Sequence, residues 1–474
     1  MRVPRAQPEL QARTAAPDPP LTGVRAWLLR PCSVSESAAI YAVAFLSSAL
    51  LGLLRQILLN RHFGTGDAIT AYYAAFRLPE TLHLLLAGGT LANALIPVLL
   101  AVQVQAGEQA TRRFINITAT MLISVVIPLS AVWILAAPLF VRTVLAPGFD
   151  TATSDLTIAL TRLLLLDLIL AVLVGVAMGV LISRNQVILP ALAVATQNIT
   201  LMLGIAAAMY VPGVGIWGPA LGAVGDLVLQ LLILLPGLWW QGIRLRPHWS
   251  PNDPHLRQVV RLLIPNGLSG AVNYAGAIVD TAAGSLARTA GSIAAQYNAA
   301  LLFGLPVRLF GVAIGQAALP RLAEYTAQEA WQPLRHSLRW AIAVALGLSL
   351  LTIGAIVLLA RPAIRLVLER GAFSAAAGDL TYTLLLVYAV ALPAAVITEI
   401  LTRCLIALHD TLTPLMINLI QLAVRAALAF ALLARFDIIA VALAFTLSAI
   451  LETLLLGLAL HRKLNRHMRA DRQP

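Results

Sequence analysis

Charged residues are scarce in this sequence. Asp, Glu, Lys and Arg make up 11% of its 474 residues, and hydrophobic residues make up 59%. A soluble domain carries about 25% charged residues, so this chain has too few charges to cover a soluble surface, and too many apolar residues to stay disordered. It contains a single lysine, Lys463. A Gly-x-x-x-x-Gly-Lys phosphate loop, and with it a P-loop ATPase within this chain, is therefore excluded.

Cysteine is almost absent as well. Cys32 and Cys404 are the only two cysteines, which excludes a disulfide framework and a zinc site built from cysteines. No metal cluster, nucleophile–base pair or redox pair stands out from the background, so we expect no enzyme activity and no cofactor. The net charge of +12 is better explained by basic flanks on an anionic membrane surface than by nucleic-acid binding.

The N-terminal segment differs from the rest of the chain. Residues 1–34 contain six prolines, five arginines and no apolar run, whereas a secretory signal needs an apolar run of about 7–15 residues. We predict that this segment is a disordered basic tail, or that the true start codon lies later, for instance at Val34.

Long apolar runs dominate the remainder. A helix needs about 20 mainly apolar residues to cross a hydrocarbon core of about 30 Å, and these runs are too long for barrel strands. We therefore predict an all-α polytopic membrane protein with about 12 transmembrane helices. The candidate spans are 36–60, 74–103, 114–145, 156–182, 187–211, 215–240, 258–287, 292–320, 337–360, 376–402, 411–434 and 437–461.

The distribution of basic residues sets the expected orientation. With the N-terminus in the cytoplasm, 21 Arg and Lys residues fall on the cytoplasmic side of these spans and 7 on the outer side. Because cytoplasmic loops are enriched in Lys and Arg, we predict a multi-pass membrane protein with both termini in the cytoplasm.

An internal repeat divides the chain. The segment APGFDTATSDLTIAL (146–160) aligns with RGAFSAAAGDLTYTL (370–384), and the same offset of 224 residues aligns Pro190 with Pro414. We therefore predict two six-helix halves related by a pseudo-two-fold axis along the membrane normal, an architecture typical of transporters. The expected division is 1–34 tail, 35–240 N-terminal half, 241–257 cytoplasmic linker, 258–462 C-terminal half and 463–474 basic cytoplasmic tail.

Four segments carry a resemblance to a known family. They are LLGLLRQILLNRHFGTG (50–66) with AFRLPETLHLLLAGGTLANALIPVL (75–99), APGF (146–149) with LTR (160–162), ERGAFS (369–374), and RCLIALHDTLTP (403–414). Together they resemble the MurJ/MviN lipid II flippases of the multidrug/oligosaccharidyl-lipid/polysaccharide exporter superfamily. The resemblance covers about residues 36–462.

The resemblance implies a function. It implies alternating-access flipping of undecaprenyl-pyrophosphate-linked peptidoglycan precursor (lipid II) for cell wall biogenesis in the bacterial plasma (inner) membrane. Membrane lipids and a coupling ion are the further partners expected, and the apolar composition predicts no nucleic-acid partner. It also implies cavity arginines that meet the pyrophosphate, since Arg donates bidentately and stays charged. Arg55 matches one of these arginines, whereas Ala49, His83 and Leu301 replace others.

Because several of the family's cavity arginines are replaced in this sequence, other functions remain open. The alternatives are an exporter of another lipid-linked saccharide or amphiphile on the same scaffold, and a non-transporting homologue that takes part in envelope assembly.

The predicted substrate-binding residues are Arg55, His83, Arg77 and Asp280. Arg55 either contacts phosphate or extends to the interface, and Arg77 either lines the cavity mouth or anchors the helix there. His83 is either a pH-dependent cation or a neutral, hydrogen-bonded histidine. Asp280 faces the cavity or has a charged partner within the bundle.

Three further acidic residues lie in apolar runs. Glu399 and Arg403 are four residues apart on one helix, which favours an intrahelical ion pair, and a gate or coupling-ion role is the alternative. Asp167 and Asp226 are each expected to face a cavity or to be paired, because an isolated charge within a membrane is costly.

Overall fold

The computed structural model describes residues 23–86 and 88–470, and every regular element in these ranges is helical. The first part of the chain forms α1 Val24–Leu28, α2 Val34–Phe63, α3 Asp67–Leu86, α4 Gly88–Phe140, the π-helical turn η2 Val141–Leu145, α5 Thr151–Leu165, α6 Asp167–Ser183, α7 Ile188–Thr196, α8 Ile199–Tyr210 and α9 Trp217–Trp239. Two helices meet within α4, at Gly107, whose φ of 78° is not helical.

The second part of the chain is also helical. It forms α10 Pro254–Ser285, α11 Ser292–Pro306, η3 Val307–Val312, α12 Ala313–Ala327, α13 Trp331–Ala355, η4 Ile356–Ala360, α14 Arg361–Val367, α15 Ala375–Val390, α16 Leu392–Ala407, α17 Leu412–Phe436 and α18 Ile439–Ala470.

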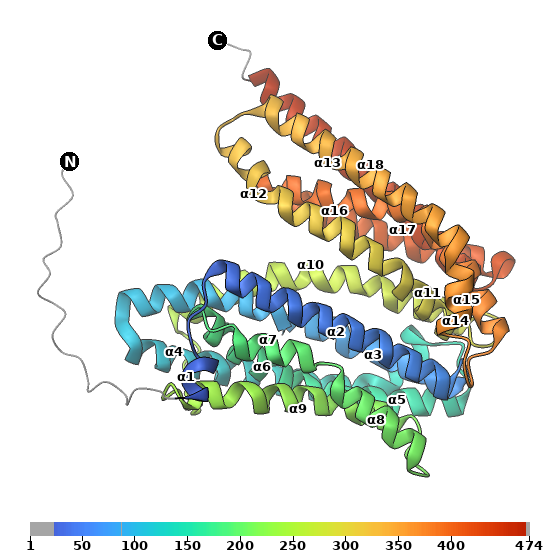
Figure 1. The fold of residues 1–474 in the computed structure, drawn as a ribbon, viewed down its shortest axis with the longest axis horizontal. Helices are drawn as coiled ribbons and strands as arrows, with labels where there is room; N and C mark the ends of the chain where they lie inside the picture. Colours follow the sequence, from blue (N-terminus) through green and yellow to red (C-terminus); the bar gives the residue numbers. More distant parts are fainter. Residues whose placement is uncertain (1–22, 87, 471–474) are drawn as a thin grey trace, which may run out of the picture.

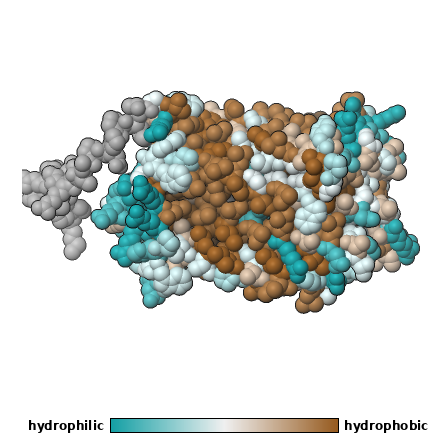
Figure 2. Space-filling model, turned by 90° about the horizontal axis from the view of Figure 1, so that it is seen from below, coloured by the Kyte–Doolittle hydropathy of each residue, from teal (hydrophilic) through white to brown (hydrophobic). Residues whose placement is uncertain are grey.

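Apolar helices confirm the membrane assignment. Nine helical segments of the described residues are long and apolar enough to span a membrane, or ten if α15 and α16, which meet at 48°, count as one. The predicted number of twelve spans is not confirmed by this test. Large apolar side chains such as Leu135, Leu351 and Leu358 are more than 70% exposed. Figure 2 shows that apolar side chains cover the middle of one face, with hydrophilic residues toward both ends.

The predicted repeat is visible in how equivalent helices begin. Asp150 accepts hydrogen bonds from the Ala152 and Thr153 amides at the start of α5, and Ser374 accepts one from the Ala377 amide at the start of α15. Asp150 and Ser374 are related by the 224-residue offset, and Phe149 and Phe373 stand immediately before them. The repeat therefore preserves the capping position, although the capping residue differs.

Ion pairs beside these caps repeat as well. Asp155 pairs with Arg142 at 2.7 Å in the first half, and its equivalent Asp379 pairs with Arg361 at 2.8 Å in the second. Both pairs join the helix after the loop to the helix before it. The aspartates stand at equivalent positions of the repeat, whereas the arginines that pair with them do not.

Apolar cores lie mainly within each half. One large cluster of buried side chains is built from α11 to α18, and two others are built mainly from α2 to α9. Helix α10 packs against α3 and α4 on one side and against α17 on the other. The boundaries predicted for the halves, at residues 240 and 258, stay a prediction.

Loops from both halves meet at one end of the molecule. The Ala372 amide donates to the Arg61 carbonyl at 2.8 Å, and the Gly148 amide donates to the Ser285 hydroxyl at 3.2 Å. Gly291, at φ 71°, lies against Thr65. We call this region, residues 61–66, 146–149, 285–291 and 370–373, the closed end. At the opposite end the ribbons of α12 and α13 diverge from those of α1 and α4 (Figure 1).

The terminal segments are more structured than predicted. Within the predicted tail 1–34, α1 is helical, and Leu29 and Cys32 are buried because apolar residues such as Val187 and Ile188 pack nearby. The prediction for residues 1–22 lies outside the described residues. At the other terminus α18 continues to Ala470, so most of the predicted tail 463–474 is helical.

Candidate functional site

Polar side chains join the two halves midway between their ends. Arg77 on α3 donates from Nε to the Thr281 hydroxyl on α10 at 3.1 Å, and its guanidinium lies 5.5 Å from the ring centre of Tyr297 on α11. One helical turn further along α3, Glu80 accepts a hydrogen bond from the Tyr274 hydroxyl at 3.0 Å. Arg77 therefore has partners in the second half, and it is 9% exposed.

A buried amide cluster lies nearer the closed end. Asn60 donates to Asn298 at 2.7 Å and accepts from it at 3.2 Å, and Gln56 donates to the same Asn298 oxygen at 3.1 Å. The rings of Tyr73 and Tyr297 stack beside it, with centroids 3.9 Å apart. These uncharged contacts hold α2 and α3 against α11 without an ion pair between them. Sequence reasoning missed this cluster, because Asn and Gln carry no distinctive spacing.

His83 lies on α3 one turn beyond Glu80. It is half-buried and makes no hydrogen bond within the part of the chain that the structure describes. The described residues therefore include no hydrogen-bond partner that would hold His83 as a neutral histidine. Its role in substrate binding stays a prediction.

Arg308 is a candidate that sequence reasoning missed. It lies in η3, near the middle of the helical segment Ser292–Ala327, which is apolar enough to span a membrane. Its side chain is exposed, it interacts electrostatically with Tyr274, and among the described residues it has no hydrogen-bond or ion-pair partner. An isolated arginine within an apolar run was the available signal, since such charges are rare and functional by default.

Arg55 points into the first half. Its Nη1 donates to the Asn198 Oδ1 at 3.0 Å, and Asn198 in turn donates to the Ser48 carbonyl at 3.0 Å. The Nε atom of Arg55 is buried without a partner among the described residues. The predicted contact of Arg55 with phosphate is not tested by this arrangement and stays a prediction.

Asp280 has a charged partner. Its two oxygens accept hydrogen bonds from Arg425 on α17 at 2.9 and 2.5 Å, and Gln296 donates to the second oxygen at 3.0 Å. The Arg425 guanidinium also lies 4.8 Å from the ring centre of Phe445. Arg425 was missed from the sequence, although it too is an isolated arginine in an apolar run. The substrate role of Asp280 stays a prediction.

The repeat relates these two polar sites. Arg55 and Asp280 both lie on the first predicted span of their half, and their partners Asn198 and Arg425 both lie on the fifth. Each half thus places a charged residue of its first helix against its fifth span, but the charges at the equivalent positions differ. In the second half the charge is balanced by an ion pair, and in the first half the hydrogen-bond partner of Arg55 is the neutral Asn198.

Glu399 and Arg403 form the expected intrahelical ion pair on α16, with 3.6 Å between the charged atoms. The backbones of Gly311 and Gly315, on η3 and α12, lie against these two side chains. The pair is therefore packed against the helix that carries Arg308. A gate or coupling-ion role for it stays a prediction.

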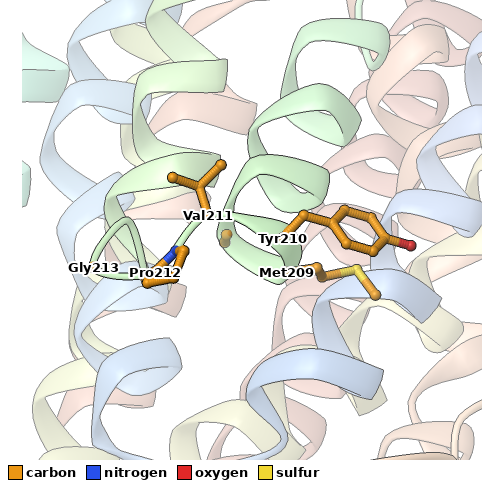
Figure 3. A pocket seen from close by; sticks show the side chains of 7 residues that line it. Met209, Tyr210, Val211, Pro212 and Gly213 are labelled. Atoms are coloured by element: carbon orange, nitrogen blue, oxygen red, sulfur yellow. The ribbon is translucent and has the colours of Figure 1, made fainter.

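The remaining candidate sites lie apart from the predicted site residues. The residues described in 23–86 and 88–470 include no group of three His, Cys, Asp or Glu side chains placed to hold a metal ion. A hollow of about 340 Å³ lies at the turn between α8 and α9, lined by residues 208–213 and 215 (Figure 3). It contains none of the predicted site residues.

Comparison with known proteins identifies relatives over most of the chain. Residues 59–470 match the profile of the family described as "Lipid II flippase MurJ". A "Probable lipid II flippase MurJ" from Rhizobium tropici is 30% identical over 429 residues, which cover 89% of this chain and 79% of that protein. A "Lipid II flippase MurJ" from Burkholderia cenocepacia is 28% identical, with 88% and 82% covered.

Solved structures support the fold. A structure described as "Lipid II flippase MurJ, inward closed conformation" superposes with a TM-score of 0.76 at 20% identity, covering 89% of this chain and 87% of that one. An "Inward-facing conformation of a multidrug resistance MATE family transporter of the MOP superfamily" gives 0.76 at 15% identity, covering 91% and 99%. At these identities the likeness concerns the fold alone.

Proposed function

The chain belongs to the family of the lipid II flippase MurJ, and from that premise we propose that it moves lipid II, the undecaprenyl-pyrophosphate-linked peptidoglycan precursor, across the bacterial inner membrane. The observation that carries the proposal is the family match over residues 59–470. The chain acts as a transporter without covalent chemistry, and an ion gradient or the membrane potential drives it.

In the proposed transport cycle, the substrate enters at the end where the two halves diverge and leaves at the closed end. Both termini face the cytoplasm, as the distribution of Arg and Lys favours, and the closed end then faces the periplasm. The precursor's head group enters between the halves from the cytoplasmic side. The contacts of the closed end, such as the Ala372–Arg61 backbone hydrogen bond, must then break to release it outside.

Arg308 is the proposed principal contact for the pyrophosphate. It is an exposed guanidinium in the middle of a spanning segment, and no described residue neutralises it. His83 on the facing α3 adds a second cation when protonated, and Arg77 adds its remaining donors at the interface of the halves. A charge-assisted hydrogen bond contributes about 1.5–3 kcal/mol, so losing one lowers affinity about ten- to hundredfold.

The test is rescue of a bacterial cell depleted of its own flippase, with lipid II accessibility measured at the outer face. The parent protein restores growth and outer lipid II, Arg308→Ala abolishes both, and Arg308→Lys restores them in part. Arg339→Ala is the matched control, since Arg339 is exposed on α13 and has no hydrogen-bond or ion-pair partner among the described residues. It should behave as the parent. Failure of the parent itself to expose lipid II, at normal membrane abundance, would overturn the proposed function.

A further inference from the structure

Two short interruptions of helical spans, called breaks below, lie beside polar groups in the first half. Asp167 begins α6 directly after the break at Leu166, and Asn198 precedes α8 after the break that ends α7 at Thr196. Neither break contains proline or glycine. Within a membrane, interrupted helices are tolerated where they are buried in protein or line a cavity, and they often mark ion-binding sites.

Buried polar atoms near these breaks have no partner. They are Oδ1 of Asp167, Oδ1 of Asp226, Oγ1 of Thr200 and Nε of Arg55, none of which has a hydrogen-bond partner among the described residues. Asp226 is only 7% exposed, and its other oxygen accepts from Gln230 at 3.0 Å. Buried polar atoms are nearly always paired in native proteins, so a group of four requires an explanation.

These atoms belong to one region. Thr200 lies against Gly225, the residue before Asp226, with 3.7 Å from the Thr200 Cβ to the position of a Cβ on Gly225. Asp226 interacts electrostatically with both Asp167 and Arg55, and Tyr72 on α3 interacts with the same two residues. Helices α2, α3, α6, α8 and α9 therefore contribute to a single polar region, which we call the N-half cluster.

The charges of the N-half cluster do not balance. The charged groups that interact with Asp226 are Asp167 and Arg55, and the neutral Tyr72 interacts with these two rather than with Asp226. Two ionised carboxylates and one guanidinium leave one net negative charge in a medium of low dielectric constant. Such a pair of carboxylates does not ionise fully, and its protons belong to the pair rather than to either residue.

We propose that Asp167 and Asp226 together hold one exchangeable proton, which makes the N-half cluster a proton-binding site. One proton neutralises the cluster and converts a carboxylate oxygen into a hydroxyl donor, which supplies a partner for an unpaired oxygen. A metal ion fits less well, because Arg55 already brings a cation and the cluster offers only two carboxylates. Only the link to transport, in which this proton is the coupling ion, rests on the proposed function.

The second half lacks this arrangement at the equivalent positions. Its corresponding break, between α15 and α16, is at Ala391, the residue that the 224-residue offset pairs with Asp167. Asp280, the buried carboxylate on the first helix of that half, is paired with Arg425. A proton bound by Asp167 and Asp226 therefore changes the charge of the first half beside the interruptions in two of its spans.

Infrared spectroscopy of the purified full-length protein in lipid nanodiscs tests the proposal directly, without lipid II. We measure the C=O stretching band of protonated carboxylic acids near neutral pH, with aspartate carboxyl groups labelled with ¹³C. Asp226→Asn and Asp167→Asn should each remove the same one-carboxyl component, because either change leaves one carboxylate opposite Arg55. Arg55→Gln should make that component roughly twice as large, because both carboxyls are then protonated.

Controls separate this result from general effects of the substitutions. Asp280→Asn should leave the component intact, since the carboxylate that it removes is ionised by Arg425. Replacing K⁺ by Na⁺ in the buffer should not change the band, and loss of the band in Na⁺ would assign the site to a metal cation and overturn the proposal. An unchanged band in both Asp167→Asn and Asp226→Asn would overturn it as well. A parent protein that shows the band but does not expose lipid II in cells would refute the proposed function and leave the proton site standing.

Discussion

Replacing Asp280 by leucine is expected to destabilise the second half strongly. The side chains of Asp280 and Arg425 are 5% and 11% exposed, and two hydrogen bonds of 2.9 and 2.5 Å join them. Removing the carboxylate leaves the guanidinium buried beside Phe445 and Gln296 without a counter-charge. Breaking a buried pair in this way costs about 3–5 kcal/mol.

A double-mutant cycle separates the interaction energy of the ion pair from the contribution that each side chain makes by packing. Arg425→Met alone should cost a similar amount, because Asp280 then keeps only the Gln296 amide as a partner. The double variant Asp280→Leu/Arg425→Met should be close to the parent, since apolar residues of similar volume can replace a buried ion pair at little cost. The expected coupling energy is therefore about 6 kcal/mol or more in magnitude, with the double variant more stable than either single variant.

The assay is the free energy of unfolding in detergent, measured by denaturant titration for all four proteins. Gly276→Ala supplies an independent check, because its new methyl group would meet the Arg425 guanidinium and should destabilise without removing a charge. If the effects of the two single variants simply add in the double variant, Asp280 and Arg425 do not stabilise each other, and the reasoning fails.

Two further predictions concern the loops. Gly371→Val should loosen the closed end, because Gly371 has a φ of 65° and lies against Arg61. An external thiol reagent should then label an Arg61→Cys variant more strongly. Unchanged labelling would contradict this prediction. Burial raises the pKa of Asp410, but Lys463 and Thr413 lower it more, so that the net pKa is below its ordinary value. Stability from Asp410 is therefore present above that ordinary value and lost as the pH falls through the lowered pKa, and Asp410→Asn should remove this acid dependence of the melting temperature.

Local features were predictable from the sequence. Length and apolarity identify the spanning segments, and the aligned residues Asp150 and Ser374 stand at equivalent helix starts because a cap depends on only a few neighbouring residues. The ion pair of Glu399 with Arg403 was also predictable, since a helix places residues four apart on one face.

Contacts between distant helices were not predictable. Arg425 is 145 residues from Asp280, and Asn198 is 143 residues from Arg55. No local sequence pattern therefore predicts either contact. The helix breaks at Leu166 and before Asn198 lack the usual proline or glycine signal, so the sequence does not predict them. The count of twelve spans rested on hydropathy alone, which does not tell a bent span from two helices.

The most direct test of the central claim is to lock the closed end while lipid II is being followed. Arg61 and Ala372 are both exposed, and their backbones are joined by a hydrogen bond of 2.8 Å across the two halves. In flippase-depleted cells rescued by an Arg61→Cys/Ala372→Cys variant, a membrane-impermeant, reductively cleavable thiol cross-linker is added, and outer lipid II is measured. The account predicts that cross-linking stops the appearance of lipid II outside, that reductant restores it, and that either single-cysteine variant is unaffected. Continued exposure of lipid II by fully cross-linked protein would contradict the account.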